Sequence, residues 1–300
     1  MKKAMFAFVM FFMMVATIGY AAESNVYLNQ IGSDTGLVVD IYIDGATSSV
    51  GSASGATSTD EQFLVGGGTN NNIDIDIIGG TNYVYGEWIN DSTNSAVADL
   101  TINNSGAGIQ TRVDVGEDAT VTNVRLNQLS SAASNVFTYR IGNSLIACTA
   151  GDTGSTIPGA VGADASDVSS CSAVSASSGV AVSGLSVDVD VTSASNLLNI
   201  TNVTTATNDT LIDVDIATGT ANDVDLYAGG TGVHNTSVNI AGASNEILGI
   251  QKGAGTTTLT LDVDASSAKI NTYQDLTSLN SSTINLDINS AADIDIVITD

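Results

Sequence analysis

The chain has 300 residues, with 32 Asp and Glu against seven Lys and Arg, and a formal net charge of -25. Phosphate recognition depends on clusters of Lys and Arg, so this balance excludes nucleic acid as an expected partner and disfavours anionic membrane surfaces. It favours cations or cationic partners. The single Trp and single Pro predict a thin core of small aliphatic side chains.

Residues 1–21 have the pattern of a secretory signal peptide. Lys2 and Lys3 form a basic segment, residues 4–19 form an apolar one, and small residues suit cleavage after Ala21. The apolar stretch is shorter than the roughly 20 residues that a spanning helix needs, and no second apolar run follows. A retained membrane anchor is the alternative. We expect an exported chain, extracellular or at the cell surface, with no integral membrane span after processing.

The rest of the chain is a succession of segments in which apolar and polar residues alternate, as in strands. These segments lie at 25–30, 38–44, 72–80, 98–105, 111–116, 123–128, 185–191, 197–203, 211–217, 223–229, 236–242, 246–253, 258–265, 269–276, 283–289 and 293–300. None has an apolar period of 3.6 residues long enough for a helix. The sequence therefore predicts an all-β protein.

Similar segments recur along the C-terminal half at a nearly constant spacing. Asp188, Asp213, Asn239, Asp262 and Asp287 follow one another at intervals of 25, 26, 23 and 25 residues, with another strand about halfway between each pair. This predicts a β-solenoid of two-strand coils of about 24 residues, with about eleven coils in all and Gly, Ser, Asn and Thr at the corners. Tandem β-sandwich domains are the alternative, although sandwiches normally need an aromatic core.

Two Gly- and Ser-rich segments, 45–61 and 147–179, interrupt the period and are expected to be loops inserted on the rod. The resulting organisation is a signal peptide (1–21), an N-terminal β-repeat region (22–146), an insertion (147–179) and C-terminal β-solenoid repeats (180–300).

Cys148 and Cys171, the only two cysteines, bracket the second insertion. Because the chain is expected to be exported, we predict that they form a structural disulfide. Closing this loop would stabilise the fold by roughly 3 kcal/mol in the chain-entropy model.

Alternating Asp pairs are the most repeated chemical feature, and in a strand both members of a pair face the same side. One interpretation is weak Ca²⁺ binding by hard oxygen ligands. The other, which we favour, is a solvated acidic face that blocks sheet-to-sheet aggregation. No other cofactor is expected. The candidate calcium ligands are Asp188, Asp190, Asp213, Asp215, Asp262 and Asp264.

Signals of catalysis are sparse, and we expect no enzyme. Two Asp-Thr-Gly triplets, at 34–36 and 152–154, are of the type found in aspartic proteases, but they follow Ser and Gly rather than an apolar strand. His234 is the only histidine, and we interpret it as a corner residue.

Two segments carry a family resemblance. In SNVYLNQIG, Ser24 stands six residues before Gln30 and Gly32 two after it; in TNVRLNQ, Thr122 stands six before Gln128. This spacing resembles the repeat of curlin, the subunit of bacterial curli amyloid fibres, which reads Ser-x5-Gln-x4-Asn-x5-Gln.

The resemblance has limits and implications. Thr35 and Ala133 stand where curlin has Asn, and Ile41 where it has the second Gln. What the resemblance implies is a strand-turn-strand coil with inward Gln and Asn ladders, fibre assembly and a biofilm role. The Asp-rich repeats from residue 185 onward are not expected to share those ladders.

These observations favour a secreted structural or adhesive cell-surface protein, such as a curli-like fibre or matrix subunit. The strand expected at 293–300 is uncapped, and an unpaired edge is a template for self-association. The alternative is a binding module, an adhesin or phage-type fibre component that recognises a surface glycan or protein through its insertions.

Overall fold

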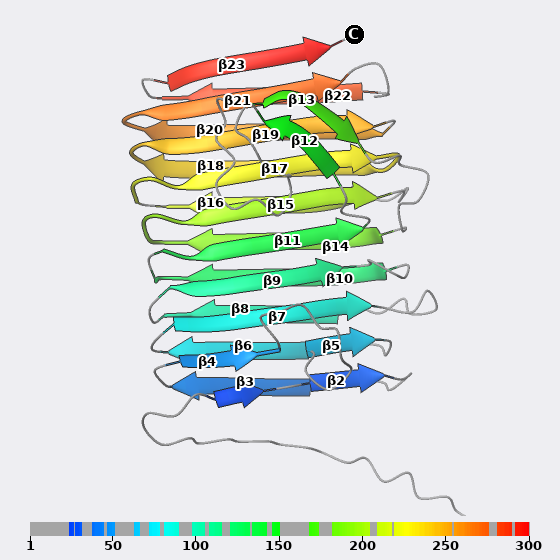
Figure 1. The fold of residues 1–300 in the computed structure, drawn as a ribbon, viewed down its shortest axis with the longest axis vertical. Coiled ribbons are helices and arrows are strands. Elements are labelled where there is room, and N and C mark those ends of the chain that lie inside the picture. The colour runs from blue at the N-terminus through cyan, green and yellow to red at the C-terminus, as the bar shows by residue number, and fades with distance from the viewer. Residues whose placement is uncertain are drawn as a thin grey trace, which may run out of the picture.

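Two long β-sheets lie face to face in the computed structural model of the chain (Figure 1). The structure describes residues 24–26, 28–31, 38–44, 47–51, 63–66, 72–78, 81–89, 98–105, 108–115, 121–132, 134–142, 146–150, 168–173, 182–204, 209–217, 219–253, 255–275, 281–289 and 292–299. All the regular elements among these residues are strands.

One sheet has nine strands in the order β22-β20-β18-β16-β14-β10-β8-β6-β3, and every neighbouring pair is parallel. We call it the nine-stranded sheet. Its strands are β3 (Val38–Asp44), β6 (Asn72–Ile78), β8 (Ala98–Asn104), β10 (Val121–Ser130), β14 (Val182–Val191), β16 (Asp209–Ile216), β18 (Val233–Gly242), β20 (Thr256–Ala265) and β22 (Ser281–Ile288).

The facing sheet has twelve strands, again parallel, with the main order β1-β4-β7-β9-β11-β15-β17-β19-β21-β23. We call it the twelve-stranded sheet. Its strands are β1 (Ser24–Val26), β2 (Leu28–Ile31), β4 (Thr47–Val50), β5 (Phe63–Gly66), β7 (Thr81–Ile89), β9 (Ile109–Val115), β11 (Val136–Gly142), β15 (Leu197–Thr204), β17 (Asp223–Gly230), β19 (Asn245–Gly253), β21 (Ala268–Asp275) and β23 (Ala292–Thr299).

The chain alternates between the sheets, so each coil supplies one strand to each, and the coils stack along the long axis (Figure 1). This confirms the predicted β-solenoid of two-strand coils. The described residues place nine strands in the nine-stranded sheet, fewer than the eleven coils expected from length alone, because the insertions take up part of the chain.

The strand register corrects the predicted repeat. Asp213 pairs with Ser237, and Asn239 pairs with Asp215. The sequence treated Asp188, Asp213 and Asn239 as matching positions of successive coils. Asp188 and Asp213 do match, but Asn239 and the positions after it lie two residues beyond the match. A shift of two keeps every side chain on the same face, which is why the alternation pattern could not reveal it.

The insertions also differ in detail from the prediction. Within the first, 45–61, residues Thr47–Val50 form β4, which pairs with β1 and β7. Within the second, β12 (Ile146–Ala150) and β13 (Val168–Ala173) form an antiparallel pair apart from both large sheets. We call this pair the hairpin. The solenoid continues across it, since β10 pairs directly with β14 and β11 with β15.

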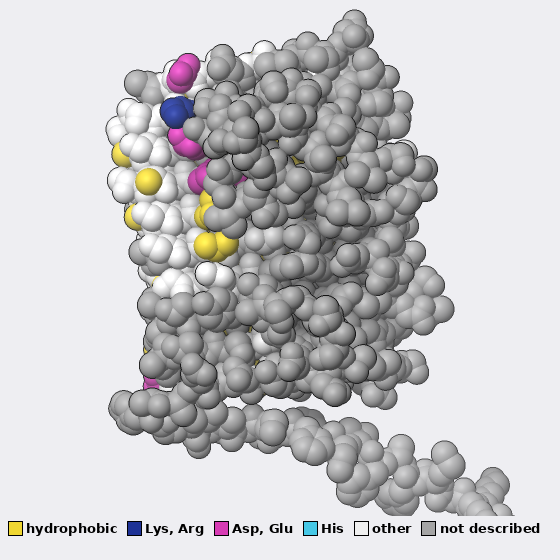
Figure 2. Space-filling model, in the orientation of Figure 1, with side chains coloured by type: hydrophobic (Ala, Val, Ile, Leu, Met, Phe, Trp, Pro, Cys, Tyr) yellow, Lys and Arg dark blue, Asp and Glu magenta, His cyan; other side chains and the backbone are white. Residues whose placement is uncertain are grey.

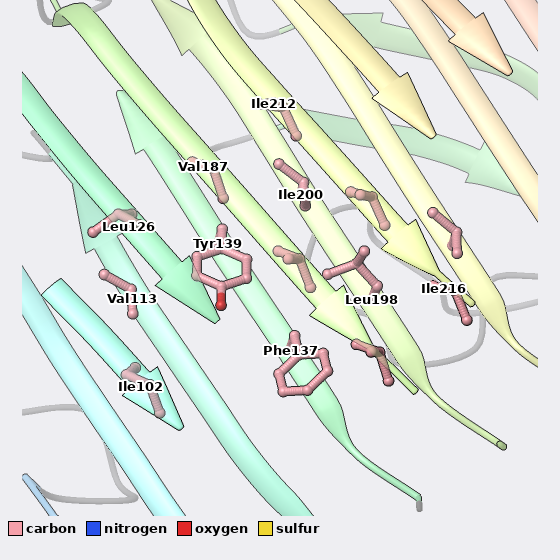
Figure 3. Packing of buried hydrophobic residues seen from close by; sticks show 14 of the residues in the cluster. Ile102, Val113, Leu126, Phe137, Tyr139, Val187, Leu198, Ile200, Ile212 and Ile216 are labelled. Carbon is pink, nitrogen blue, oxygen red and sulfur yellow. The ribbon is translucent and has the colours of Figure 1, made fainter. Parts of the chain in front are cut away.

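The core is a strip of inward-facing aliphatic side chains between the two sheets (Figure 3). One column of the nine-stranded sheet runs through Ile75, Ile102, Val189 and Val214, all buried. Two aromatic side chains of β11, Phe137 and Tyr139, are also fully buried. The core is therefore aliphatic as predicted, with these two aromatics as its bulkiest members.

A buried asparagine ladder runs along one corner. In each of four coils the residue before the Asn has a positive φ, at Ser134, Ser195, Ala221 and Ser244. The ladder is Asn135 Nδ2 to Asn196 Oδ1 at 2.8 Å, Asn196 Nδ2 to Asn222 Oδ1 at 2.9 Å, and Asn222 Nδ2 to Asn245 Oδ1 at 3.0 Å. The expectation that the Asp-rich repeats lack inward amide ladders is therefore wrong.

His234 lies inside the solenoid and is 0% exposed, so its interpretation as a corner residue is wrong. It belongs to an interior polar column in which Thr210 Oγ1 lies 3.1 Å from His234 Nδ1. On the facing sheet, Asn202 Nδ2 of β15 donates to Thr210 Oγ1 at 2.7 Å. The neighbour of Asn202 on β17 is Ala228. The register thus places the small Ala228 opposite His234, which gives the imidazole room.

Candidate functional site on the outer faces of the sheets

The outward side chains of the nine-stranded sheet form two long polar columns, which we call the acidic face. One column contains Asp40, Asp74, Thr101, Asn127, Asp188, Asp213, Ser237, Thr260 and Asn285. The other contains Tyr42, Asp76, Asn103, Leu129, Asp190, Asp215, Asn239, Asp262 and Asp287. All are exposed or half-buried.

Neither column is a continuous row of carboxylates. The register leaves no run of stacked Asp longer than two, and amides or hydroxyls separate the runs in most places. Asn103 Nδ2 donates to Asp76 Oδ1 at 3.2 Å, and Asn127 Nδ2 donates to Thr101 Oγ1 at 3.3 Å. Stacked side chains lie ~4.8 Å apart, so these neutral groups reduce the like-charge repulsion that uninterrupted Asp rows would create.

The candidate calcium ligands from the sequence fall into three places. Asp188, Asp190, Asp213 and Asp215 form a two-by-two block on adjacent strands β14 and β16. Asp262 lies in the Asp190 column beyond Asn239, while the neighbour of Asp264 on β18 is Ala241. Over the part of the chain that the structure describes, no three His, Cys, Asp or Glu side chains converge as metal ligands.

Crowding within the two-by-two block changes its acidity. Partial burial, followed by the charges of Asp190, Asp213 and Asp215, raises the pKa of Asp188. Burial and the charges of Asp213 and Asp190 likewise raise the pKa of Asp215, while a hydrogen bond from Asn239 lowers it. The block therefore concentrates negative charge on one open patch.

The outward side of the twelve-stranded sheet is different, because much of it is covered. Five outward side chains of β15, β17 and β19 are buried, and we call them the covered face: Asn199, Asp225, Tyr227, Leu248 and Ile250. Figure 1 draws the hairpin in front of β17, β19 and β21. Beside them runs an open column, in which Lys269 Nζ lies 2.8 Å from Glu246 Oε1. Figure 2 shows Lys or Arg and Asp or Glu side chains along this margin.

Asp225 is the chemically unusual member of the covered face. It is 2% exposed, and neither carboxylate oxygen has a hydrogen-bond partner. Burial, followed by the charges of Asp223 and Glu246, raises the pKa of Asp225 to about 8. Asn199, its register neighbour on β15, is 5% exposed and its Oδ1 also lacks a partner.

Sequence reasoning placed Asp225 on a solvated acidic face and so missed this site. A signal was present in the neighbouring strand, where Ile-Leu-Gly-Ile at 247–250 is apolar at outward as well as inward positions. A continuous apolar run of this length is typical of a strand buried on both faces.

The predicted disulfide and curlin-like positions are placed as follows. The register pairs Cys148 directly with Cys171 in the hairpin, and directly opposite residues of an antiparallel pair lie within the ~4.4–6.8 Å Cα separation of a disulfide. The disulfide itself stays a prediction. Ser24 lies in β1, Gln30 in β2 and Thr122 in β10, whereas Gly32 lies outside the described residues.

Gln128, the remaining curlin-like position, points inward. It is 1% exposed, donates to the Ile102 carbonyl at 3.3 Å, and accepts a hydrogen bond from the Tyr139 hydroxyl at 3.2 Å. This agrees with the inward Gln that the resemblance implies.

The signal peptide at 1–21 and both Asp-Thr-Gly triplets lie outside the described residues. No helix of membrane-spanning length and hydropathy occurs in the part of the chain that the structure describes. No family model, no curated protein sequence and no solved structure matches this chain.

Proposed function

We propose that the protein is a secreted, non-enzymatic structural or adhesive component of the cell surface, in which solenoids associate end to end as a fibre or matrix subunit. The observation that carries this proposal is the exposure of interior positions in the coil of β22 and β23. Ile294 and Ile296 are 39% and 48% exposed, although they continue two interior columns in which Ile270 and Thr272 are 1% and 2% exposed.

The backbone of this coil supports the same interpretation. Among the described strands, β22 pairs only with β20, and β23 only with β21. A solenoid coil buries its core only against a neighbouring coil. A further coil would bury the exposed interior positions of β23, and an unpaired strand edge is a template for one. In this proposal a second copy of the solenoid supplies that coil. Head-to-tail contact between unlike ends gives an open filament.

The curlin-like spacing at 24–32 and 122–128 is a further support, since the resemblance implies fibre assembly.

Electron microscopy and sedimentation of the purified chain lacking residues 1–21 test the proposal. We expect filaments that the Ile296→Asp variant fails to form, because a charge at this position opposes burial against a second coil. Leu211→Asp is the matched control, since Leu211 is 47% exposed on the side of the rod, and it should still form filaments. A chain that stays monomeric with and without Ca²⁺ would contradict the fibre proposal.

A binding module is the second candidate, favoured by the position of the hairpin. Figure 1 draws β12 and β13 on the outside of the stack, where an insertion can contact a surface glycan or protein without disturbing the coils. Deleting residues 147–179 should then abolish adhesion to the target surface while the far-ultraviolet circular dichroism remains that of a β-protein. Adhesion that survives the deletion would count against this candidate.

A further inference from the structure

The covered face holds carbonyl and carboxylate oxygens that lack any protein partner. Both carboxylate oxygens of Asp225 and the Oδ1 of Asn199 are buried without a hydrogen bond. Their residues are register neighbours on β17 and β15, and both are at least nine-tenths buried. Three acceptor oxygens therefore face the same side of the sheet from adjacent strands.

An arrangement of this kind is costly without a ligand. A buried polar group with no partner costs about 1–3 kcal/mol, and a buried unpaired charge costs more. The nearest charged neighbours, Asp223 and Glu246, add negative potential. Lys269, the cation on this margin, lies 2.8 Å from Glu246. The three oxygens thus need a proton or a cation.

The spacing suits a cation with oxygen ligands. Outward side chains on adjacent strands lie ~4.8 Å apart, about twice the ~2.4 Å between Ca²⁺ and a ligand oxygen. Ca²⁺ accepts carboxylates and amide carbonyls in flexible geometry, whereas Mg²⁺ requires a nearly ideal octahedron and keeps most of its waters. Asp pairs on the acidic face have the same spacing, but water can solvate them.

We propose that Asp225 and Asn199 bind a Ca²⁺ ion on the covered face of the twelve-stranded sheet, with Asp223 supplying further negative charge and water completing the ligand set. This site is separate from the acidic face, where the sequence pattern placed its candidate ligands. It does not depend on the proposed function, since it concerns one coil of the solenoid rather than its ends.

Binding of the ion should be measurable directly. Isothermal titration calorimetry of the full chain with CaCl₂ should detect about one bound Ca²⁺ per chain. Thermal unfolding in parallel should show a higher Tm with Ca²⁺ than with a chelator.

Two variants remove the site and one tests its location. Asp225→Asn and Asn199→Ala should both lose the calorimetric binding and the Ca²⁺-dependent rise in Tm. Asp213→Asn, on the acidic face, is the matched control and should retain both. Because Asp225→Asn is nearly isosteric, we expect it to fold, and Asn199→Ala gives an independent measurement.

Three results would overturn the proposal. One is a wild-type chain that shows no calorimetric binding of Ca²⁺ and no change of Tm with it. Another is an Asp225→Asn variant that keeps the full response. The third is loss of the response in Asp213→Asn alone, which would place the ion on the acidic face instead.

Discussion

The two outer faces of the solenoid are built from the same repeating coil and have opposite surroundings. On the acidic face, Asp188 and Asp213 are stacked neighbours on adjacent strands and remain accessible to water. On the covered face, Asn199 and Asp225 are stacked in the same way, yet both are buried. The comparison shows that alternation along a strand decides which side chains point outward, while the packing over each sheet decides which of those meet solvent.

The two faces also treat charge differently. On the acidic face the Asp runs are short, and Asn and Thr side chains hydrogen bond within the columns. On the covered face Asp225 has no such partner, and burial is the leading cause that raises the pKa of its carboxyl to about 8. The same residue type is therefore open to solvent on one face and buried without a hydrogen bond on the other.

A pair of outward leucines gives the largest expected difference between the faces. Leu248 on the covered face is 1% exposed, and Leu211 beside the acidic face is 47% exposed. Leu248→Ala should lower the free energy of unfolding by about 3 kcal/mol, because it removes buried methyl groups and leaves a cavity. Leu211→Ala should change it by less than about 0.5 kcal/mol. Denaturant unfolding measures both.

Equal effects of the two leucine substitutions would break the comparison. A small loss at both sites would mean that Leu248 is not buried in solution. A large loss at both would mean that the acidic face is also covered, for instance by a second copy of the chain.

Two asparagines give the next largest difference. Asn222 accepts from the Asn196 side chain at 2.9 Å and from the Asn196 backbone at 3.1 Å, and it donates to Asn245 at 3.0 Å. Asn222→Ala leaves these buried groups without partners and should cost about 2–3 kcal/mol. Asn127, on the acidic face, has a half-buried side chain that donates to Thr101. Asn127→Ala should lower the free energy of unfolding by less than about 0.5 kcal/mol.

Hydrogen exchange can localise the effect of Asn222→Ala. The Asn196 amide, which donates to Asn222 Oδ1, should lose protection in the variant, with Asn127→Ala as the control that leaves it protected. Unchanged protection of Asn196 would show that the ladder contributes little to the stability of this corner.

Much of the fold could be predicted from the sequence because it depends on local pattern. Strict alternation fixes which residues of β14 and β16 face inward, and a period near 24 residues requires the coils to stack. The register beyond Asp213 could not be predicted, because a shift of two residues preserves the alternation. The corner loops, which vary in length from coil to coil, set that register instead.

The candidate sites were harder to predict, since they depend on contacts between residues distant in the chain. Nothing in the segment around His234 shows that Ala228 stands opposite and leaves it room. The burial of Asp225 likewise depends on what covers β17. A positive φ could be expected at corners in general, but not at the particular residues before Asn196 and Asn222. The asparagine ladder could not be predicted without knowing which residues of successive coils are register neighbours.

The pH dependence of stability gives the last and smallest expected difference, and it tests the burial of Asp225 on the covered face. In metal-free buffer the folded protein keeps the Asp225 proton up to about pH 8, whereas the unfolded chain loses it near ~4. The folded state therefore binds more protons between these values, and stability falls as pH rises, by up to about 1.4 kcal/mol per unit.

His234 acts in the opposite direction over a lower window. Burial lowers the pKa of its imidazole to about 4, while the unfolded chain takes up this proton near ~6.5, so stability falls as pH decreases from ~6.5 to ~4.

The effects of Asp225 and His234 oppose each other below ~6.5, and of the two only that of Asp225 acts between ~6.5 and ~8. The wild-type chain should lose roughly 2 kcal/mol across that upper window. Asp225→Asn should be flat there, while Asp213→Asn should retain the slope because Asp213 lies on the other sheet and leaves the surroundings of Asp225 unchanged. A wild-type chain with no slope in metal-free buffer would mean that Asp225 is solvated, and the contrast between the covered face and the acidic face would then disappear.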